Sequence, residues 1–345
     1  MQWKAVAGIV LAGISGMGIH AQKPVVTVTP SGSGQFTTVQ AAVDSAGEKG
    51  IVIKIAPGTY REKLHIDKPG VELRGTGAKP QDVVLTYDDS AKSAGGTGKS
   101  GSVNVSGDNF YAESLTIQND WEKKNARINE GAQAVALLLT SDRAVLRHVR
   151  LLGYQDTLYA SSKSCHVNYD PASGAPAPEL CHASRQLFED CYIEGHVDYI
   201  FGDAKAVFKN CELHGMTHSM VTITAQSKMY PTEDSGYLFL DCTITSETGV
   251  DRLSFGRPWR AYARVYFVNT TVKDATLDPP GWMEWSGKLA TSDYAEYNTH
   301  EPGGTAVKTA TRIAPSRQLT KAEAGKLTVD SWLAAPDGWK PESVH

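Results

Sequence analysis

The stretch Phe188-Glu189-Asp190-Cys191-Tyr192-Ile193 decides the fold, because it recurs along the chain. Close copies begin at Phe208, Phe239 and Phe267, so that successive copies start 20, 31 and 28 residues apart. Each copy is a short β-rich run with Asp or Asn before a small residue, which is typical of a strand, a tight bend and a second strand. A fixed strand unit with variable spacing predicts coils of constant cross-section that carry loops of different length.

Weaker copies of the unit lie at Tyr111–Thr116 and Val145–Arg150. The repeat therefore predicts an all-β, single-domain solenoid of parallel strands, and the ends of a solenoid need caps. Residues Thr37–Asp44 read as a short amphipathic helix with a Thr cap, and Thr320–Glu323 has the spacing of a capping box at the other end. We expect Ser90–Ser102 to be a flexible exposed loop and find no domain boundary.

The bulk composition restricts the class of protein. The 345 residues with 41% hydrophobic content are enough to bury a substantial core. The net charge of −4 comes without a basic stripe, so nucleic acid is not an expected partner.

The first 21 residues read as a secretory signal peptide. Lys4 supplies the positive charge, Ala5–Ile19 the apolar stretch, and His20-Ala21-Gln22 a cleavage point after Ala21. A membrane anchor is the alternative, but the stretch is short and rich in glycine, which favours cleavage. We therefore expect residues 22–345 to form the catalytic domain of a secreted protein, extracellular or periplasmic, with no membrane attachment.

Five cysteines in an exported chain indicate disulfide bonds. Cys165 and Cys181 bracket a Pro/Gly/Ala-rich insertion, and we predict that a disulfide bond between them closes this loop. Cys191 and Cys211 hold equivalent positions in the repeat and would lie about 4.8 Å apart on neighbouring strands, close enough to bridge. The alternative for this pair is two buried, unbonded thiols. Cys242 is predicted to be a buried free thiol, and no metal site is expected because the chain lacks a Cys-x-x-Cys motif.

Two short runs place an aspartate among aromatic and apolar residues: Gly153-Tyr154-Gln155-Asp156-Thr157-Leu158-Tyr159 and Asp198-Tyr199-Ile200-Phe201-Gly202-Asp203-Ala204. A carboxylate on a solvated face usually has polar neighbours, so the burial of these two suggests a chemical role. Two carboxylates close together in a low-dielectric site cannot both ionise easily. One stays charged as nucleophile or base, while the other keeps a proton to donate. Taken singly, either aspartate would read as a turn or capping residue.

Three further segments stand in order with these runs: Gly58-Thr59-Tyr60-Arg61-Glu62, Gln133-Ala134-Val135-Ala136-Leu137 and Gly256-Arg257-Pro258-Trp259. The five motifs together resemble those of the pectin methylesterases, and the resemblance spans about Val25 to Trp339. It implies a right-handed parallel β-helix with short capping helices. It also implies a carboxylic ester hydrolase that removes methyl esters from homogalacturonan, giving pectate and methanol without a metal or cofactor. Because β-helices with capped ends are often monomers, we expect a monomer. A methyl-esterified, nearly neutral polymer suits the chain's charge better than a fully acidic one.

The resemblance gives each polar motif residue a role. Asp198 matches the nucleophile that attacks the ester carbonyl carbon, and Arg257 matches the partner that hydrogen-bonds it and lowers its pKa. Asp156 matches the general acid, which protonates the leaving methanol and then activates the water that hydrolyses an acyl-enzyme intermediate. Gln155 is placed by its motif to donate to the oxyanion, with Gln133 assisting.

Substrate binding is predicted to be aromatic, because sugar faces and methyl esters are apolar. The candidates are Trp259, Tyr159, Phe201, Trp282 and Met283. We expect Trp285 to pack in the core, and Tyr60 and Glu62 to order the neighbouring coil.

The sequence offers less support for four alternatives to an aspartate-based pectin esterase. A serine triad lacks support, because the chain has no Gly-x-Ser-x-Gly elbow and His196 and His218 lie outside any serine motif. A pectin or pectate lyase on the same solenoid would use an Arg base, often with calcium, but no acidic cluster has calcium-ligand spacing. An esterase or thioesterase for a different ester is a further alternative. A noncatalytic relative would be expected to lack Asp156, Asp198 or Arg257, and all three are present.

Overall fold

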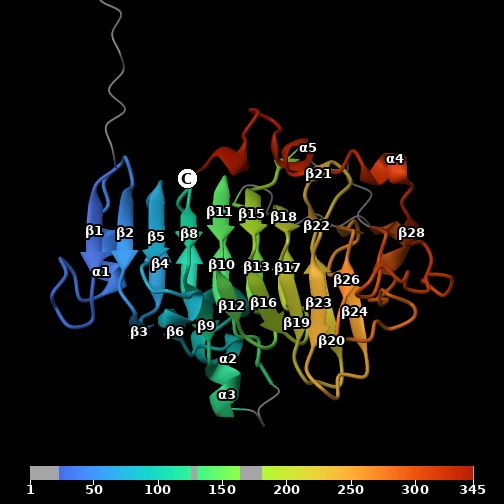
Figure 1. Cartoon of the computed structure of the whole chain (residues 1–345), viewed down its shortest axis with the longest axis horizontal. Coiled ribbons are helices and arrows are strands. Elements are labelled where there is room, and N and C mark those ends of the chain that lie inside the picture. The colour runs from blue at the N-terminus through green and yellow to red at the C-terminus, as the bar shows by residue number, and fades with distance from the viewer. Residues whose placement is uncertain (1–22, 126–129, 164–180, 345) are drawn as a thin grey trace, which may run out of the picture.

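The computed structural model describes residues 23–125, 130–163 and 181–344, which coil into a parallel β-helix (Figure 1). The strands stack into three long sheets, to which a full coil contributes one strand each, and all strand pairs in these sheets are parallel. Apolar side chains from the three sheets fill the space between them and form one continuous core. Within the described residues the first sheet has 11 strands, the second 7 and the third 8.

The strands of the first sheet, in spatial order, are β1 (Val25–Val28), β2 (Ile51–Ile55), β5 (Val71–Gly75), β8 (Tyr111–Glu113), β11 (Ala144–Arg147), β15 (Arg185–Glu189), β18 (Lys205–Lys209), β22 (Gly236–Leu240), β25 (Arg264–Val268), β27 (Asp293–Tyr297) and β28 (Arg317–Gln318). Those of the second are β4 (Leu64–Ile66), β7 (Val103–Val105), β10 (Leu137–Leu139), β13 (Leu158–Ala160), β17 (Ile200–Gly202), β20 (Val221–Gln226) and β24 (Leu253–Gly256).

The third sheet comprises β3 (Gly58–Arg61), β6 (Val83–Tyr87), β9 (Thr116–Asn119), β12 (Arg150–Leu152), β16 (Tyr192–Gly195), β19 (Glu212–Gly215), β23 (Thr243–Ser246) and β26 (Thr271–Val272). A short pair, β14 (Cys181–His182) and β21 (Glu233–Asp234), stands apart from these sheets. The helices are α1 (Val39–Asp44), α2 (Ala91–Ala94), α3 (Trp121–Asn125), α4 (Lys321–Ala324) and α5 (Val329–Leu333), with 3-10 turns η1 (Pro80–Asp82), η2 (Thr97–Lys99), η4 (Lys288–Thr291) and η5 (Pro341–Ser343). None of these helices has the length and apolar character needed to cross a membrane.

The four close copies of the predicted repeat are confirmed by a stack of phenylalanine rings inside the coil, whereas the two weaker copies are one residue out of register, since Leu146 and Ala112 align with Phe188. Phe188, Phe208, Phe239 and Phe267 pair in register on β15, β18, β22 and β25. Their ring centroids lie 4.7, 4.5 and 4.3 Å apart, with interplanar angles of 10° or less. Strand spacing in a sheet is about 4.8 Å, so each ring occupies the place that the strand register dictates.

The Asp or Asn of each repeat forms the tight bend that follows the strand. Asp190, Asn210, Asp241 and Asn269 all have left-handed backbones, with φ between 54° and 55°. Asn and Asp tolerate this conformation better than other non-glycine residues. Their side chains also bond along the stack, since Asn269 Nδ2 donates to Asp241 Oδ1 at 3.0 Å.

The predicted disulfide between Cys191 and Cys211 is wrong, because both are free, buried thiols. Equivalent positions on stacked coils direct their side chains the same way, whereas a disulfide needs its two Cβ atoms to approach each other. Each sulfur instead lies near a carbonyl of the preceding coil, Cys191 Sγ at 3.5 Å from Leu146 O and Cys211 Sγ at 3.4 Å from Phe188 O. Cys242 is a buried free thiol, as predicted.

The second predicted disulfide joins Cys165 and Cys181. Cys165 lies outside the described residues, so its bond to Cys181 stays a prediction.

The predicted capping helices are present at both ends. Thr38 caps α1, accepting a hydrogen bond from Ala41 N, and the Glu62 carboxylate accepts bonds from Val39 N and Gln40 N, both at 2.9 Å. Glu62 therefore orders the first coil, as expected. At the other end, Thr320 forms the predicted capping box of α4.

The segment Ser90–Ser102 differs from the expected flexible loop. It contains α2 and η2, and the side chains of Ser100 and Ser102 are fully buried. Ser100 Oγ accepts a hydrogen bond from Val135 N, which fastens the segment to the chain just before β10. The segment is therefore anchored at its C-terminal serines, whereas Lys92, Ser93, Gly95, Gly98 and Lys99 are exposed, as expected of this segment.

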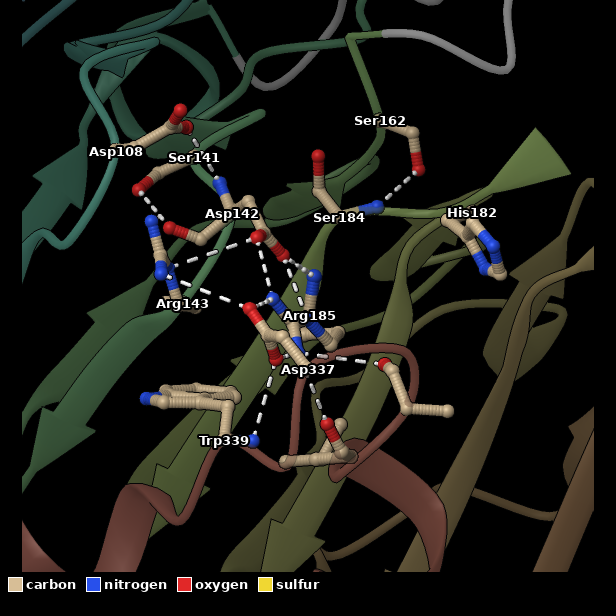
Figure 2. Close-up of polar contacts among 12 residues, drawn as sticks. Asp108, Ser141, Asp142, Arg143, Ser162, His182, Ser184, Arg185, Asp337 and Trp339 are labelled. Atoms are coloured by element: carbon tan, nitrogen blue, oxygen red, sulfur yellow. Dashed lines mark hydrogen bonds and ion pairs between the residues drawn. The ribbon is translucent and has the colours of Figure 1, made fainter.

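The C-terminal segment lies along the outside of the first sheet, where α5 packs against β15 and β18 (Figure 1). Figure 2 shows the ionic cluster that fastens it, with Arg185 between Asp142 and Asp337. Arg185 Nη2 donates to Asp142 Oδ2 at 2.7 Å and to Asp337 Oδ2 at 3.1 Å. These contacts lower the pKa of Asp337 to about 2, so the anchor stays charged over the physiological pH range.

Candidate active site

The predicted polar residues converge on a cavity of about 430 Å³ on the second sheet. It is lined by Thr97, Gly98, Gln133, Gln155, Asp156, Tyr159, Asp198, Phe201, Ala225, Arg257, Trp259 and Trp285. Gln133, Asp156 and Asp198 precede β10, β13 and β17, which are neighbours in this sheet, and Arg257 follows β24. Parallel stacking thus gathers residues that are up to 124 positions apart in the sequence, from Gln133 to Arg257.

The two aspartates occupy equivalent positions on adjacent coils. Leu158 of β13 pairs with Ile200 of β17. Asp156 lies two residues before Leu158, and Asp198 lies two residues before Ile200. Asp156 N also donates to Val197 O at 3.1 Å, which ties the two turns together. Both side chains are largely buried, with 8% of Asp156 and 6% of Asp198 exposed. Two buried carboxyl groups therefore face the same cavity.

The two carboxyl groups differ in their electrostatic environment. Burial raises the pKa of Asp156 well above its usual range, and the charge of Asp198 raises it further. Asp156 is consequently suited to hold a proton.

Asp198 is stabilised in its ionised form by Arg257. The guanidinium donates from Nε to Oδ1 at 2.9 Å and from Nη2 to Oδ2 at 2.7 Å, a bidentate pair. Burial raises the pKa of Asp198, and Arg257 opposes that rise without reversing it. Arg257 thus lowers the pKa of Asp198, as expected, but desolvation outweighs the ion pair and the pKa stays above its ordinary value. The difference from Asp156 is one of surroundings, because only Asp198 has the guanidinium bonded to it.

Aromatic rings form one wall of the cavity. Tyr159 and Phe201 stack with centroids 4.2 Å apart, and Trp259 meets Phe201 edge-on at 5.8 Å. The Trp285 ring lies under the Arg257 guanidinium, whose Cζ is 4.0 Å from the ring centroid. These rings give the site an apolar surface next to its charged groups.

Two of the predicted binding residues lie elsewhere. Trp282 is 1% exposed and stacks on Tyr294 in the core at 4.2 Å, so it does not line the cavity. The residue bridges to Gly256 in parallel, and its side chain belongs to the main core cluster inside the coil. Met283 lines a separate pocket of about 120 Å³ with Met220 and Ser254.

Trp285, which we expected in the core, lines the cavity, so the expected roles of the two tryptophans were reversed. Thr97, Gly98 and Ala225 were also missed. Thr97 and Gly98 belong to the segment read as a loop, and Ala225 follows Thr224 on a strand with no chemical signal of its own.

Comparison with known proteins agrees with this geometry. The pectinesterase family model matches residues 25–169 and 179–336. The chain is 34% identical over 334 residues to probable pectinesterase/pectinesterase inhibitor 17 of Arabidopsis thaliana, covering 92% of this chain and 58% of that protein. It is 32% identical over 323 residues to pectinesterase 31 of the same plant, covering 89% and 92%. The chain thus spans less than two thirds of the first relative and most of the second.

Solved structures are similar over nearly the whole fold. Pectin methylesterase from carrot has a TM-score of 0.74 at 27% identity, covering 90% of this chain and 93% of that one. Pectin methylesterase from Erwinia chrysanthemi has a TM-score of 0.72 at 28% identity, covering 93% and 99%. The parallel coils, the convergent site and these matches together lead to one conclusion: the chain belongs to the pectinesterase family.

Proposed function

We propose that this protein hydrolyses the methyl esters of homogalacturonan through an acyl-enzyme intermediate on Asp198. The observation that carries the proposal is the pairing of Asp198 with Arg257 in the cavity that also holds Asp156, a buried carboxyl group suited to keep its proton. Two similar solved structures of pectin methylesterase, at 27% and 28% identity, are complexes with hexasaccharides, which supports a polysaccharide substrate.

In the first half-reaction, a carboxylate oxygen of Asp198 attacks the ester carbonyl carbon. Arg257 orients this carboxylate through its two hydrogen bonds. The carbonyl oxygen gains negative charge, which the side-chain amides of Gln155 and Gln133 stabilise by donating N–H groups. The bond to the methoxy oxygen then breaks, and Asp156 gives that oxygen its proton, so that methanol leaves.

The second half-reaction reverses the role of Asp156. Now a carboxylate, it takes a proton from a water molecule as the water attacks the acyl carbon. The bond to Asp198 breaks, releasing the galacturonate carboxyl group and regenerating the ionised nucleophile. Each cycle therefore yields one methanol, one acid and the starting protonation states.

The aromatic rings that line the cavity bind the sugars of the substrate. Tyr159, Phe201 and Trp259 present rings to the cavity, and Trp285 extends that surface beside Arg257. Apolar rings suit the faces of sugars and the methyl group of the ester.

The proposal is tested on highly methylated pectin by following methanol, acid and ultraviolet absorbance together. Equal release of methanol and acid with constant absorbance supports the esterase. Growing absorbance from an unsaturated uronide, without methanol, would identify a lyase. If all three signals stay constant, a different ester or a binding role replaces this proposal.

We also propose that the protein is exported and acts as a monomer. The apolar segment at residues 1–21 supports a cleavable signal peptide, although it lies outside the described residues. The test is to find the mature N-terminus at Gln22 in an extracellular or periplasmic fraction and to measure the mass of the native particle.

A further inference from the structure

We propose that His196 is a positioning residue for both aspartates of the site, and that Glu122 holds it in the tautomer which that task requires. The inference rests on the proposed esterase function. His196 lies in the turn between β16 and β17, two residues before Asp198, and is only 3% exposed. Its ring is enclosed by the ring of His218, which stacks on it with centroids 4.4 Å apart.

The hydrogen bonds of the ring fix its tautomer. Val197 N lies 2.7 Å from His196 Nδ1, and a backbone N–H can only donate, so Nδ1 has to be the acceptor. In the neutral ring the proton then resides on Nε2, which lies 2.8 Å from Glu122 Oε1. The carboxylate accepts a hydrogen bond from Nε2–H, and this bond selects the tautomer that leaves Nδ1 free to accept from Val197 N.

The peptide group held by His196 is connected to the catalytic turns. Val197 O accepts the hydrogen bond from Asp156 N at 3.1 Å, and Val197 directly precedes Asp198. The backbone of His196 bonds to the coils on both sides, donating to Tyr154 O at 3.0 Å and accepting from Thr222 N at 2.8 Å. A change in the orientation of this ring therefore shifts the backbone of both aspartates.

Glu122 brings the other side of the cavity into the same network. It belongs to α3, whose Trp121 packs in a small apolar cluster with Ala132 and Ala134, the two neighbours of Gln133. The bond between Glu122 and His196 thus connects the segment that carries Gln133 with the turn that carries Asp198. Neither residue lines the cavity, so both act through the positions of residues that do.

The test compares Glu122→Ala with Glu122→Gln, because an amide oxygen can still accept a hydrogen bond from Nε2–H while an alanine cannot. For Glu122→Ala and His196→Ala we expect kcat for methanol release to fall about tenfold, as a small misplacement of reacting groups does. KM should change by less than about twofold, because substrate-binding rings are untouched. Glu122→Gln should retain kcat within about twofold.

Two further variants separate positioning from general stability. Lys123→Ala, an exposed neighbour on α3, should match the wild type in kcat and melting temperature. Glu122→Ala combined with His196→Ala should be no slower than His196→Ala alone, because Glu122 acts through His196.

The outcomes are distinct from those that test the esterase itself. A wild type without methanol release contradicts the proposed function, whereas an active wild type leaves the positioning role to be judged by the variants. Normal kcat in Glu122→Ala, loss of kcat in Glu122→Gln equal to that in Glu122→Ala, or additive losses in the double variant would each overturn the role of His196.

Discussion

Asp156 and Asp198 share a left-handed backbone conformation, with φ of 64° and 52°, at the same point of two successive coils. This region is uncommon for residues other than glycine, and Asp and Asn tolerate it best. The turn that places each carboxyl group in the cavity is therefore itself selective for these two residue types. Asparagine is consequently the substitution that removes the charge and leaves the backbone unstrained.

Asp198→Asn and Asp156→Asn should each reduce kcat at least about 10³-fold, since one lacks the nucleophile and the other the proton donor. Methanol release measures the loss, and circular dichroism with thermal unfolding checks the fold. An Asp198→Asn protein with near-normal turnover and a native spectrum would rule out the covalent mechanism.

The same Asp156→Asn variant should be more stable than the wild type at neutral pH. The folded pKa of Asp156 lies above its unfolded value, so the native state binds this proton more tightly. Its contribution to the free energy of unfolding is fully present below the unfolded pKa and is lost as pH rises through the folded pKa.

Asparagine has no such proton to lose. Denaturant unfolding at a series of pH values should show the two proteins diverging as pH rises from the acid range toward neutrality, the variant being the more stable. A constant difference across that range would mean that Asp156 has an ordinary pKa.

Arg257→Ala should impair catalysis by raising the pKa of Asp198 further, because burial then acts without the opposing guanidinium. A higher fraction of protonated nucleophile at low pH should move the acid limb of the kcat/KM profile to higher pH. Maximal activity should also fall about 10²-fold or more, since the carboxylate is no longer oriented. The activity of Arg257→Lys should lie between those of the wild type and Arg257→Ala, because lysine supplies charge without the bidentate geometry. If the acid limb of Arg257→Ala stayed at the wild-type pH, ionisation of Asp198 would not be what sets that limb.

Trp285 and Trp282 form a matched pair for testing the aromatic wall. Trp285→Ala removes a ring from the cavity and should raise KM about tenfold, with little change in melting temperature. Trp282→Ala creates a cavity in the core and should lower the free energy of unfolding by about 3–5 kcal/mol. Pectin kinetics and denaturant titration of both proteins make the comparison. If KM rose in Trp282→Ala and not in Trp285→Ala, Trp282 and not Trp285 would be the residue that binds substrate.

The coil architecture could be predicted from the sequence because its signal is repeated. Each phenylalanine of the stack is followed by an Asp or Asn at the bend and then a small residue, and the strand register determines where they lie. The polar site was predictable for a similar reason, since Gln133, Asp156 and Asp198 belong to motifs in a recognised order. Their convergence follows directly once the coils are stacked.

What failed depended on local geometry that the sequence does not encode in any periodic way. Trp282 and Trp285 are three residues apart in a non-repeating segment, and nothing in the pattern distinguishes the ring that lies in the core from the ring that lines the cavity. The pairing of Cys191 with Cys211 was inferred from proximity, but side-chain direction decides whether a disulfide forms. Likewise, the small residues of Ser90–Ser102 suggest an exposed loop, but they do not reveal its short helical turns or its buried serines.

The phenylalanine stack has a consequence for how enzymes of this shape can diversify. Its rings keep nearly constant separation although 20 to 31 residues separate them in the chain. Residues added in a connecting loop are therefore absorbed outside the coil, whereas one residue added within a strand unit would displace every ring and aspartate that follows. Loops at the rim of the cleft can thus lengthen or shorten over evolutionary time and alter which polymer is accepted, while the reacting groups keep their mutual spacing.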